Sequence, residues 1–173
     1  YPVVYMQGSL GASGDLVPLA HLTLPLVGLG EVEVEGKVIS GEEMLRKFNW
    51  QPIQLASKEG LALLNGTQNM GAFAVWALLQ SHRLSDWADK IAAMSLDAYY
   101  GLTAPFTDAV HQVRPHKGQI VTAARMRELL AGSEIVEKPK SYVQDPYSFR
   151  CIPQVHGTVK DTIAYVDSVI DVE

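Results

Sequence analysis

The chain has 173 residues, of which 47% are apolar, enough for a sizeable core. Its formal net charge of −5 provides no basic footprint, which argues against a nucleic-acid partner. Its single cysteine, Cys151, excludes an internal disulfide framework and suits a reducing compartment. We find no signal peptide and no uninterrupted apolar span, so we expect a cytoplasmic protein that does not enter a membrane.

The first motif is the glycine-rich stretch 8–16, GSLGASGDL, which contains Ala12-Ser13-Gly14. The amide nitrogen of Gly14 can attack the carbonyl carbon of Ala12 and close a five-membered ring. Loss of one water there, and of a second across the Ser13 Cα–Cβ bond, leaves a 4-methylidene-imidazol-5-one. Gly14 has no Cβ to block the attack, and Ser13 supplies the hydroxyl that is eliminated. Such a ring can serve as an electrophilic organic cofactor.

Other glycine-rich motifs do not fit this stretch. The spacing Gly8-x-x-Gly11-x-x-Gly14 differs from the dinucleotide fingerprint, and no Gly-Lys-Ser/Thr ends a phosphate-binding loop. Asp15 stands where a nucleophile elbow around Ser13 requires glycine. An isolated Ala-Ser-Gly is also a common turn, so the residues alone leave both ring formation and a plain turn open.

Short elements follow the glycine-rich stretch. Residues 31–40 (EVEVEGKVIS) alternate valine with charge around a glycine, which predicts a small exposed β-hairpin. Ser40 and Glu43 have capping-box spacing ahead of a short helix over residues 41–48. The region up to residue 67 contains one further helical turn or two.

The second half of the chain predicts longer helices. The longest covers about 68–98 and is apolar over more than one face, so we expect deep burial, including against other subunits. A helix over about 115–131 ends at Gly132. Residues 133–150 form a long non-periodic segment, which predicts an active-site loop. A further helix begins at Thr158.

Four sequence runs occur in a fixed order: 8–21 (GSLGASGDLVPLAH), 59–68 (EGLALLNGTQ), 114–119 (RPHKGQ) and 144–154 (QDPYSFRCIPQ). Together they resemble the histidine ammonia-lyase family, within the superfamily of aromatic amino-acid lyases and aminomutases. Gly11 before the tripeptide, and the choices Pro146, Ser148 and Cys151, favour histidine over phenylalanine as substrate. The resemblance extends from Pro2 to about residue 157.

The resemblance implies an all-α fold: a long-helix bundle with a minor β-hairpin and extended loops, as a fragment of a larger, mainly helical lyase. It implies that Ala12-Ser13-Gly14 forms the ring autocatalytically and without a metal. It also implies that Asp15 steers ring closure, although the residues alone equally allow a helix cap. In the family, four identical subunits assemble and combine residues of different subunits in each active site. Ser13 and Arg150 of one chain would then serve different sites.

The resemblance also assigns roles to four residues outside the tripeptide. Asn65 would hydrogen-bond the ring carbonyl and the substrate amino group, Tyr147 would lie beside the ring for binding or proton transfer, and Gln144 would help hold the substrate or the loop. Arg150 would clamp the substrate carboxylate with its planar guanidinium. The residue types alone equally allow Asn65 to be a turn residue, Tyr147 a packed aromatic ring and Arg150 a surface charge.

Histidines near the third run do not indicate a metal site. His111 and His116 flank Arg114, but no cysteine or carboxylate cluster accompanies them. We therefore expect structural histidines at a helix entrance.

The implied reaction is elimination of ammonia from L-histidine to give trans-urocanate. A complete lyase of this kind is much longer, and its catalytic loop tyrosine lies upstream of Tyr1. We therefore expect this chain to be a central fragment that is inactive alone and in which the ring can remain unformed. Two alternatives stay open. One is a fragment of a phenylalanine or tyrosine ammonia-lyase or aminomutase, and the other is a non-catalytic helical assembly piece whose tripeptide never cyclises.

Overall fold

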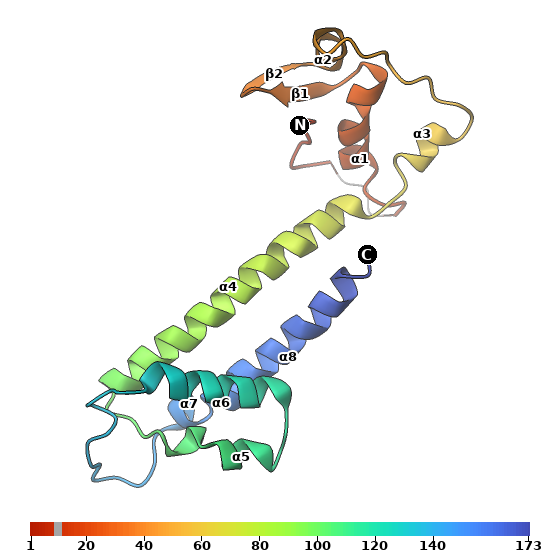
Figure 1. Ribbon diagram of the computed structural model, residues 1–173. Coiled ribbons are helices and arrows are strands. Elements are labelled where there is room, and N and C mark those ends of the chain that lie inside the picture. The colour runs from red at the N-terminus through yellow and green to blue at the C-terminus, as the bar shows by residue number, and fades with distance from the viewer. Residues whose placement is uncertain (9–11) are drawn as a thin grey trace. The chain divides into compact units, whose positions relative to one another are not determined.

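The computed structural model describes residues 1–8 and 12–173 and divides into two compact units, Tyr1–Ala74 and Val75–Glu173 (Figure 1). Part of the glycine-rich stretch, including Gly11, lies outside the described residues. The described elements are mainly helical with one two-stranded antiparallel sheet, so the expected all-α class with a minor β-hairpin is confirmed.

The first unit packs short helices around the hairpin. Val32, Met44 and Leu45 form its buried cluster. The strands pair antiparallel, and Glu35 and Gly36 at the turn both have positive φ, which matches the right-handed twist of a tight hairpin. The elements are α1 (Leu16–Thr23), η1 (Leu24–Val27), β1 (Glu31–Val34), β2 (Lys37–Ser40), α2 (Gly41–Lys47), α3 (Glu59–Ala62) and the start of α4 (Gln68–Ala98).

The second unit is formed by most of α4 and by the helices after it. Its largest buried cluster joins α4 to three later elements through Leu96, Phe106, Met126 and Ile152. The remaining elements are η2 (Ala104–Phe106), α5 (Asp108–Gln112), α6 (Lys117–Leu130), α7 (Tyr147–Arg150) and α8 (Ile152–Ile170). Within the described ranges, no helix is long and apolar enough to cross a bilayer.

Two glycines allow α6 and α8 to cross closely. An ideal Cβ at Gly118 would overlap the carbonyl oxygen of Gly157 and would lie 2.7 Å from the carbonyl carbon of Gly157. Asp161 Oδ1 accepts a hydrogen bond from Gly118 N at 2.8 Å, so a side chain of α8 satisfies a free N–H group in the first turn of α6. The crossing therefore depends on the absence of side chains at these two positions.

We expect Gly118→Ala to destabilise the 173-residue chain by about 1–3 kcal/mol, because an added methyl group forces the two backbones apart. Urea unfolding of the chain measures this change. Gly71→Ala is the matched control: no atom lies within 4 Å of an ideal Cβ at this helical glycine. The control should gain about 0.5–1 kcal/mol from alanine's better helix propensity. Equal stability of wild type and Gly118→Ala would refute the close crossing.

A buried carboxylate links α4 to α8. Asp89 is 2% exposed, and it accepts hydrogen bonds from His156 Nδ1 at 2.8 Å and from Lys160 Nζ at 2.7 Å. Burial opposes the charge on Asp89, but these two partners outweigh it and lower the pKa of the carboxyl below its usual value. The two helices are therefore joined here by a polar cluster.

The structure bears on two expectations about the long helices. The helix α8 begins at Ile152, before the expected Thr158, because Pro153 sits in its first turn, where a missing N–H costs nothing. Most of α4 is exposed in the single chain, so the part of the expected burial that depends on other subunits stays a prediction. Trp76 and Trp87 are 63% and 58% exposed, and in α4 only Asp89, Ala93 and Leu96 are buried.

Candidate active site

The tripeptide lies in the first unit beside Asn65. The Asn65 amide nitrogen donates a hydrogen bond to the carbonyl oxygen of Ser13 at 2.8 Å. Ring closure would join Gly14 N to the Ala12 carbonyl carbon, so the Ser13 carbonyl would become the carbonyl of the ring. The structure therefore brings Asn65 to the oxygen atom that the resemblance assigns to it.

The conformation at Gly14 requires glycine. Its φ is +92°, and an ideal Cβ would overlap the carbonyl oxygen of Gly66 and lie 2.8 Å from its nitrogen. Asp15 N donates to the Gly66 carbonyl at 2.8 Å. The Asn65-Gly66 turn thus packs directly on the peptide after Ser13, where a side chain would prevent the approach.

The carboxylate of Asp15 holds the tripeptide to the start of α4. Asp15 is 1% exposed, and its Oδ2 accepts from Met70 N at 2.8 Å. Although Asp15 precedes α1, its side chain makes no capping hydrogen bond to that helix. Asp15 thus stands at the N-cap position of α1 without a side-chain capping hydrogen bond, and its role in ring closure remains a prediction.

Three further site residues predicted from the sequence contact one another in the second unit. Arg150 Nη1 donates to Gln144 Oε1 at 2.6 Å, and the guanidinium carbon lies 4.1 Å from the centre of the Tyr147 ring. We name Gln144, Tyr147 and Arg150 the clamp cluster. Tyr147 is 72% exposed, so its phenol is open to a ligand.

Residues 133–150 were expected to form one extended loop. The structure differs at the end of this segment, where the clamp cluster lies. Tyr147–Arg150 form the single turn α7, because the Pro146 carbonyl accepts from Phe149 N at 3.0 Å and from Arg150 N at 3.2 Å. Residues three apart share one face of a helix, which places Tyr147 and Arg150 side by side.

Sequence reasoning missed the residues that anchor this turn. Asp145 is 3% exposed, and its Oδ2 accepts from Leu102 N at 2.7 Å. The Tyr142 hydroxyl donates to the Tyr100 carbonyl at 2.6 Å. Desolvation, together with the neighbouring Asp145 carboxylate, raises the pKa of Tyr142 to about 12. The only sequence signal was the position of Asp145 inside the QDPY run.

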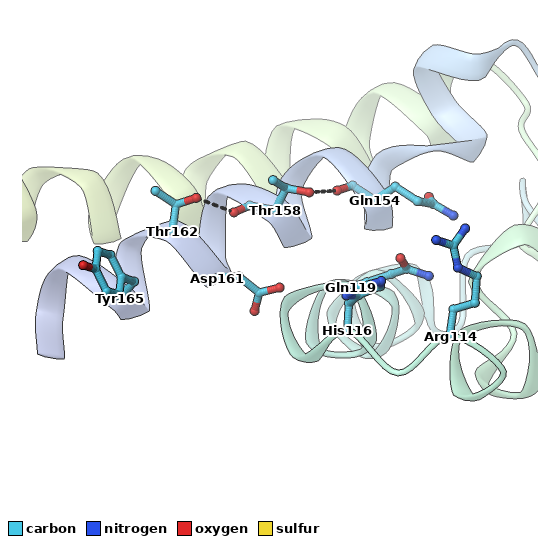
Figure 2. Close-up of a pocket in the computed structure, with 8 residues that line it drawn as sticks. All are labelled: Arg114, His116, Gln119, Gln154, Thr158, Asp161, Thr162 and Tyr165. Atoms are coloured by element: carbon cyan, nitrogen blue, oxygen red, sulfur yellow. Dashed lines mark hydrogen bonds between the residues drawn. The ribbon is translucent and has the colours of Figure 1, made fainter.

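The RPHKGQ run lines a separate groove of about 630 Å³ against α8 (Figure 2). Arg114, His116 and Gln119 face the polar side of α8 across this groove, and none of the predicted ring or clamp residues line it. The other lining residues are Gln154, Thr158, Asp161, Thr162 and Tyr165.

The histidines near this run are not gathered for a metal. His111 is fully buried, with its ring nitrogens 2.9 Å from the Pro105 carbonyl and 3.0 Å from the Gln119 amide. His111 thus joins η2 to α6, as expected of a structural histidine. Among the residues that the structure describes, no group of three or more His, Cys, Asp or Glu side chains could hold a metal ion.

Comparisons with known proteins identify relatives of the chain. The family model for aromatic amino acid lyases matches residues 1–173. The whole chain aligns at 51% identity with a histidine ammonia-lyase of Koribacter versatilis and covers 34% of that protein. The ergothionase of Treponema denticola has a TM-score of 0.90 at 30% identity, over 98% of this chain and 34% of its own. The histidine ammonia-lyase of Trypanosoma cruzi has a TM-score of 0.80 at 37% identity, over 98% of this chain and 31% of its own.

The chain has the mainly helical fold of the solved lyases, over about a third of their length. The chain belongs to the aromatic amino acid lyase family. It spans about a third of the length of the curated relatives it matches.

Proposed function

We propose that the full-length protein carrying this chain eliminates ammonia from L-histidine and releases trans-urocanate. The electrophile is a 4-methylidene-imidazol-5-one formed from Ala12-Ser13-Gly14. The curated relative at 51% identity and the solved structure at 37% identity are both histidine ammonia-lyases, which favours histidine as substrate. The single cysteine, Cys151, suits a cytoplasmic location for the protein.

The hydrogen bond between Asn65 and the Ser13 carbonyl carries this proposal. Negative charge that builds on the ring during catalysis would collect at this oxygen, where the Asn65 amide already donates at 2.8 Å. A donor positioned before the reaction stabilises such charge without reorganisation. The backbone around Gly14 and Gly66 also fits ring closure, because no Cβ obstructs the attacking nitrogen.

The ring supplies a methylidene carbon that accepts the substrate amino group and makes ammonia a better leaving group. In the overall reaction the bond between the α-carbon and nitrogen breaks, a base removes a β-proton, and the electron pair of that C–H bond forms the new double bond. Arg150 would hold the substrate carboxylate through two parallel hydrogen bonds. Tyr147, stacked on Arg150, would bind the substrate or transfer a proton, and Gln144 would keep the guanidinium oriented.

Product analysis tests the substrate assignment. The full-length protein is incubated separately with L-histidine, L-phenylalanine and L-tyrosine, and ammonia and the organic product are quantified. We expect ammonia and urocanate from histidine in equal amounts. Elimination from phenylalanine or tyrosine instead would establish the alternative lyase, and a rearranged β-amino acid without ammonia would establish an aminomutase.

We infer that the exposed apolar stripe on α4 is covered by a second copy of this chain, within the homotetramer that the resemblance implies. Leu84, Trp87, Ile91 and Met94 are each between 58% and 72% exposed and follow a three-four spacing, which is that of a helix–helix seam. Asp89, Ala93 and Leu96, the buried residues of α4, lie on the opposite side of the helix. An apolar stripe of this kind usually marks an interface.

The 173-residue chain should therefore self-associate, and Ile91→Glu should weaken that association because it places a charge in the apolar seam. Light scattering over a concentration series measures both results. Ala124→Glu introduces the same side chain at an exposed position on α6 and should not change the association. A monodisperse monomer of the wild-type chain at every concentration would contradict the inference.

A further inference from the structure

The clamp cluster is fixed by contacts to one short segment. Residues 99–102, which directly follow α4, receive three contacts from the segment that carries the cluster. The Tyr142 hydroxyl donates to the Tyr100 carbonyl at 2.6 Å, and the Asp145 carboxylate accepts from Leu102 N at 2.7 Å. The rings of Phe149 and Tyr99 stack with their centres 4.6 Å apart.

Asp145 has the most constrained place among these three contacts. It stands between Gln144 and Pro146, so its backbone is continuous with the clamp cluster on both sides. Its carboxylate is buried and accepts a charge-assisted hydrogen bond from Leu102 N. Gly101 leaves room for this carboxylate: an ideal Cβ there would lie 3.2 Å from Asp145 Oδ2 and would overlap Leu96.

Burying a carboxylate costs desolvation free energy, which an apolar side chain at the same position would avoid. Asp145 Oδ1 has no hydrogen-bond partner among the described residues, so the side chain bears a desolvation cost that one hydrogen bond only partly offsets. We therefore look for the role of this carboxylate in the position that it gives to the backbone. It fixes the residue before Pro146, whose carbonyl accepts from Arg150 N and starts α7.

We propose that Asp145 is a positioning residue that sets Arg150 for the substrate carboxylate by anchoring α7 to the Leu102 N–H. This inference rests on the proposed role of Arg150 as carboxylate clamp. Asp145 itself acts only through the backbone of the clamp cluster. Without the hydrogen bond between Leu102 N and Asp145, Arg150 and Gln144 still pair. The position of the Arg150 guanidinium relative to the rest of the site is then no longer fixed.

Binding of two ligands tests this inference in the full-length protein that also carries Ser13→Ala, so that L-histidine is not consumed during the measurement. L-histidine carries the carboxylate, whereas histamine is the same molecule without it, and calorimetry gives both affinities. Asp145→Ala should weaken L-histidine binding by about 10- to 100-fold, because the orientation of one charge-assisted clamp is lost. Histamine binding should stay within a factor of about 2, since no contact to Arg150 is involved.

Two further variants complete the design. Asp145→Asn keeps an oxygen acceptor for Leu102 N and should restore most of the L-histidine affinity. Glu137→Ala removes an exposed carboxylate earlier in the same loop and should leave both affinities unchanged. If Asp145→Ala does not unfold cooperatively, Asp145→Ser replaces it, because the serine hydroxyl ends one bond nearer the backbone than the carboxylate oxygens and carries no charge.

The outcomes separate the two proposals. Equal weakening of both ligands, or of neither, would overturn the positioning role of Asp145 while leaving the proposed function intact. Protein with Asp145 unchanged that binds L-histidine no better than histamine would instead overturn the carboxylate clamp, and the role of Asp145 with it.

Discussion

Replacing Ser13 by alanine in the full-length protein should lower turnover of L-histidine by about three orders of magnitude or more. The side chain of Ser13 supplies the hydroxyl whose elimination creates the methylidene carbon, and no ordinary side chain replaces that electrophile. Folding should be unaffected, because Ser13 is exposed and the contact with Asn65 uses the Ser13 carbonyl, which alanine retains. Initial rates of ammonia release measure the loss.

Ser57→Ala is the matched control for this substitution, since Ser57 is an exposed serine in the same unit. Its rate should equal that of the wild type. Wild-type turnover in the Ser13 variant would show that the tripeptide is an ordinary turn and that the chemistry belongs to other residues.

Arg150→Lys should lower kcat/KM for L-histidine by about 30- to 1000-fold, which corresponds to about 2–4 kcal/mol of transition-state binding. Lysine keeps the positive charge but cannot form two parallel hydrogen bonds to a carboxylate. It would also lose the pairing with Gln144 and the stack on Tyr147. Steady-state kinetics measure the change.

Arg46→Lys provides the matched control, because Arg46 is an exposed arginine on α2. It should leave kcat/KM unchanged. Full activity of Arg150→Lys would mean that a point charge suffices at this position, and the bidentate clamp would have to be abandoned.

Local chemistry explains why several elements could be predicted from the sequence. The hairpin over 31–40 has alternating valines and a Glu35-Gly36 turn, and both signals lie within ten residues. The Ser40 hydroxyl accepts from Glu43 N at 3.1 Å, as the capping-box spacing predicts. Gly132 has a φ of +76° just after α6, where a left-handed residue ends a helix.

Features that depend on distant parts of the chain could not be predicted in this way. The pairing of Gly118 with Gly157 joins residues 39 positions apart by sequence number, and neither glycine has a local signal for it. The exposed face of α4 has the composition of a buried helix, and composition alone does not distinguish an apolar face that is buried in the chain from one that is not. The QDPYSFRC run was enough to predict Gln144, Tyr147 and Arg150 as site residues. The hydrogen bond from Leu102 N to Asp145 could be seen only in the structure.

Formation of the ring from Ala12-Ser13-Gly14 is the central claim, and the intact mass of the full-length protein tests it most directly. Ring closure removes one water and elimination at Ser13 removes a second. We therefore expect the protein to be lighter than its sequence by two waters, with the loss confined to the peptide that contains residues 12–14. An unmodified mass in a folded protein that releases ammonia from L-histidine would contradict the account.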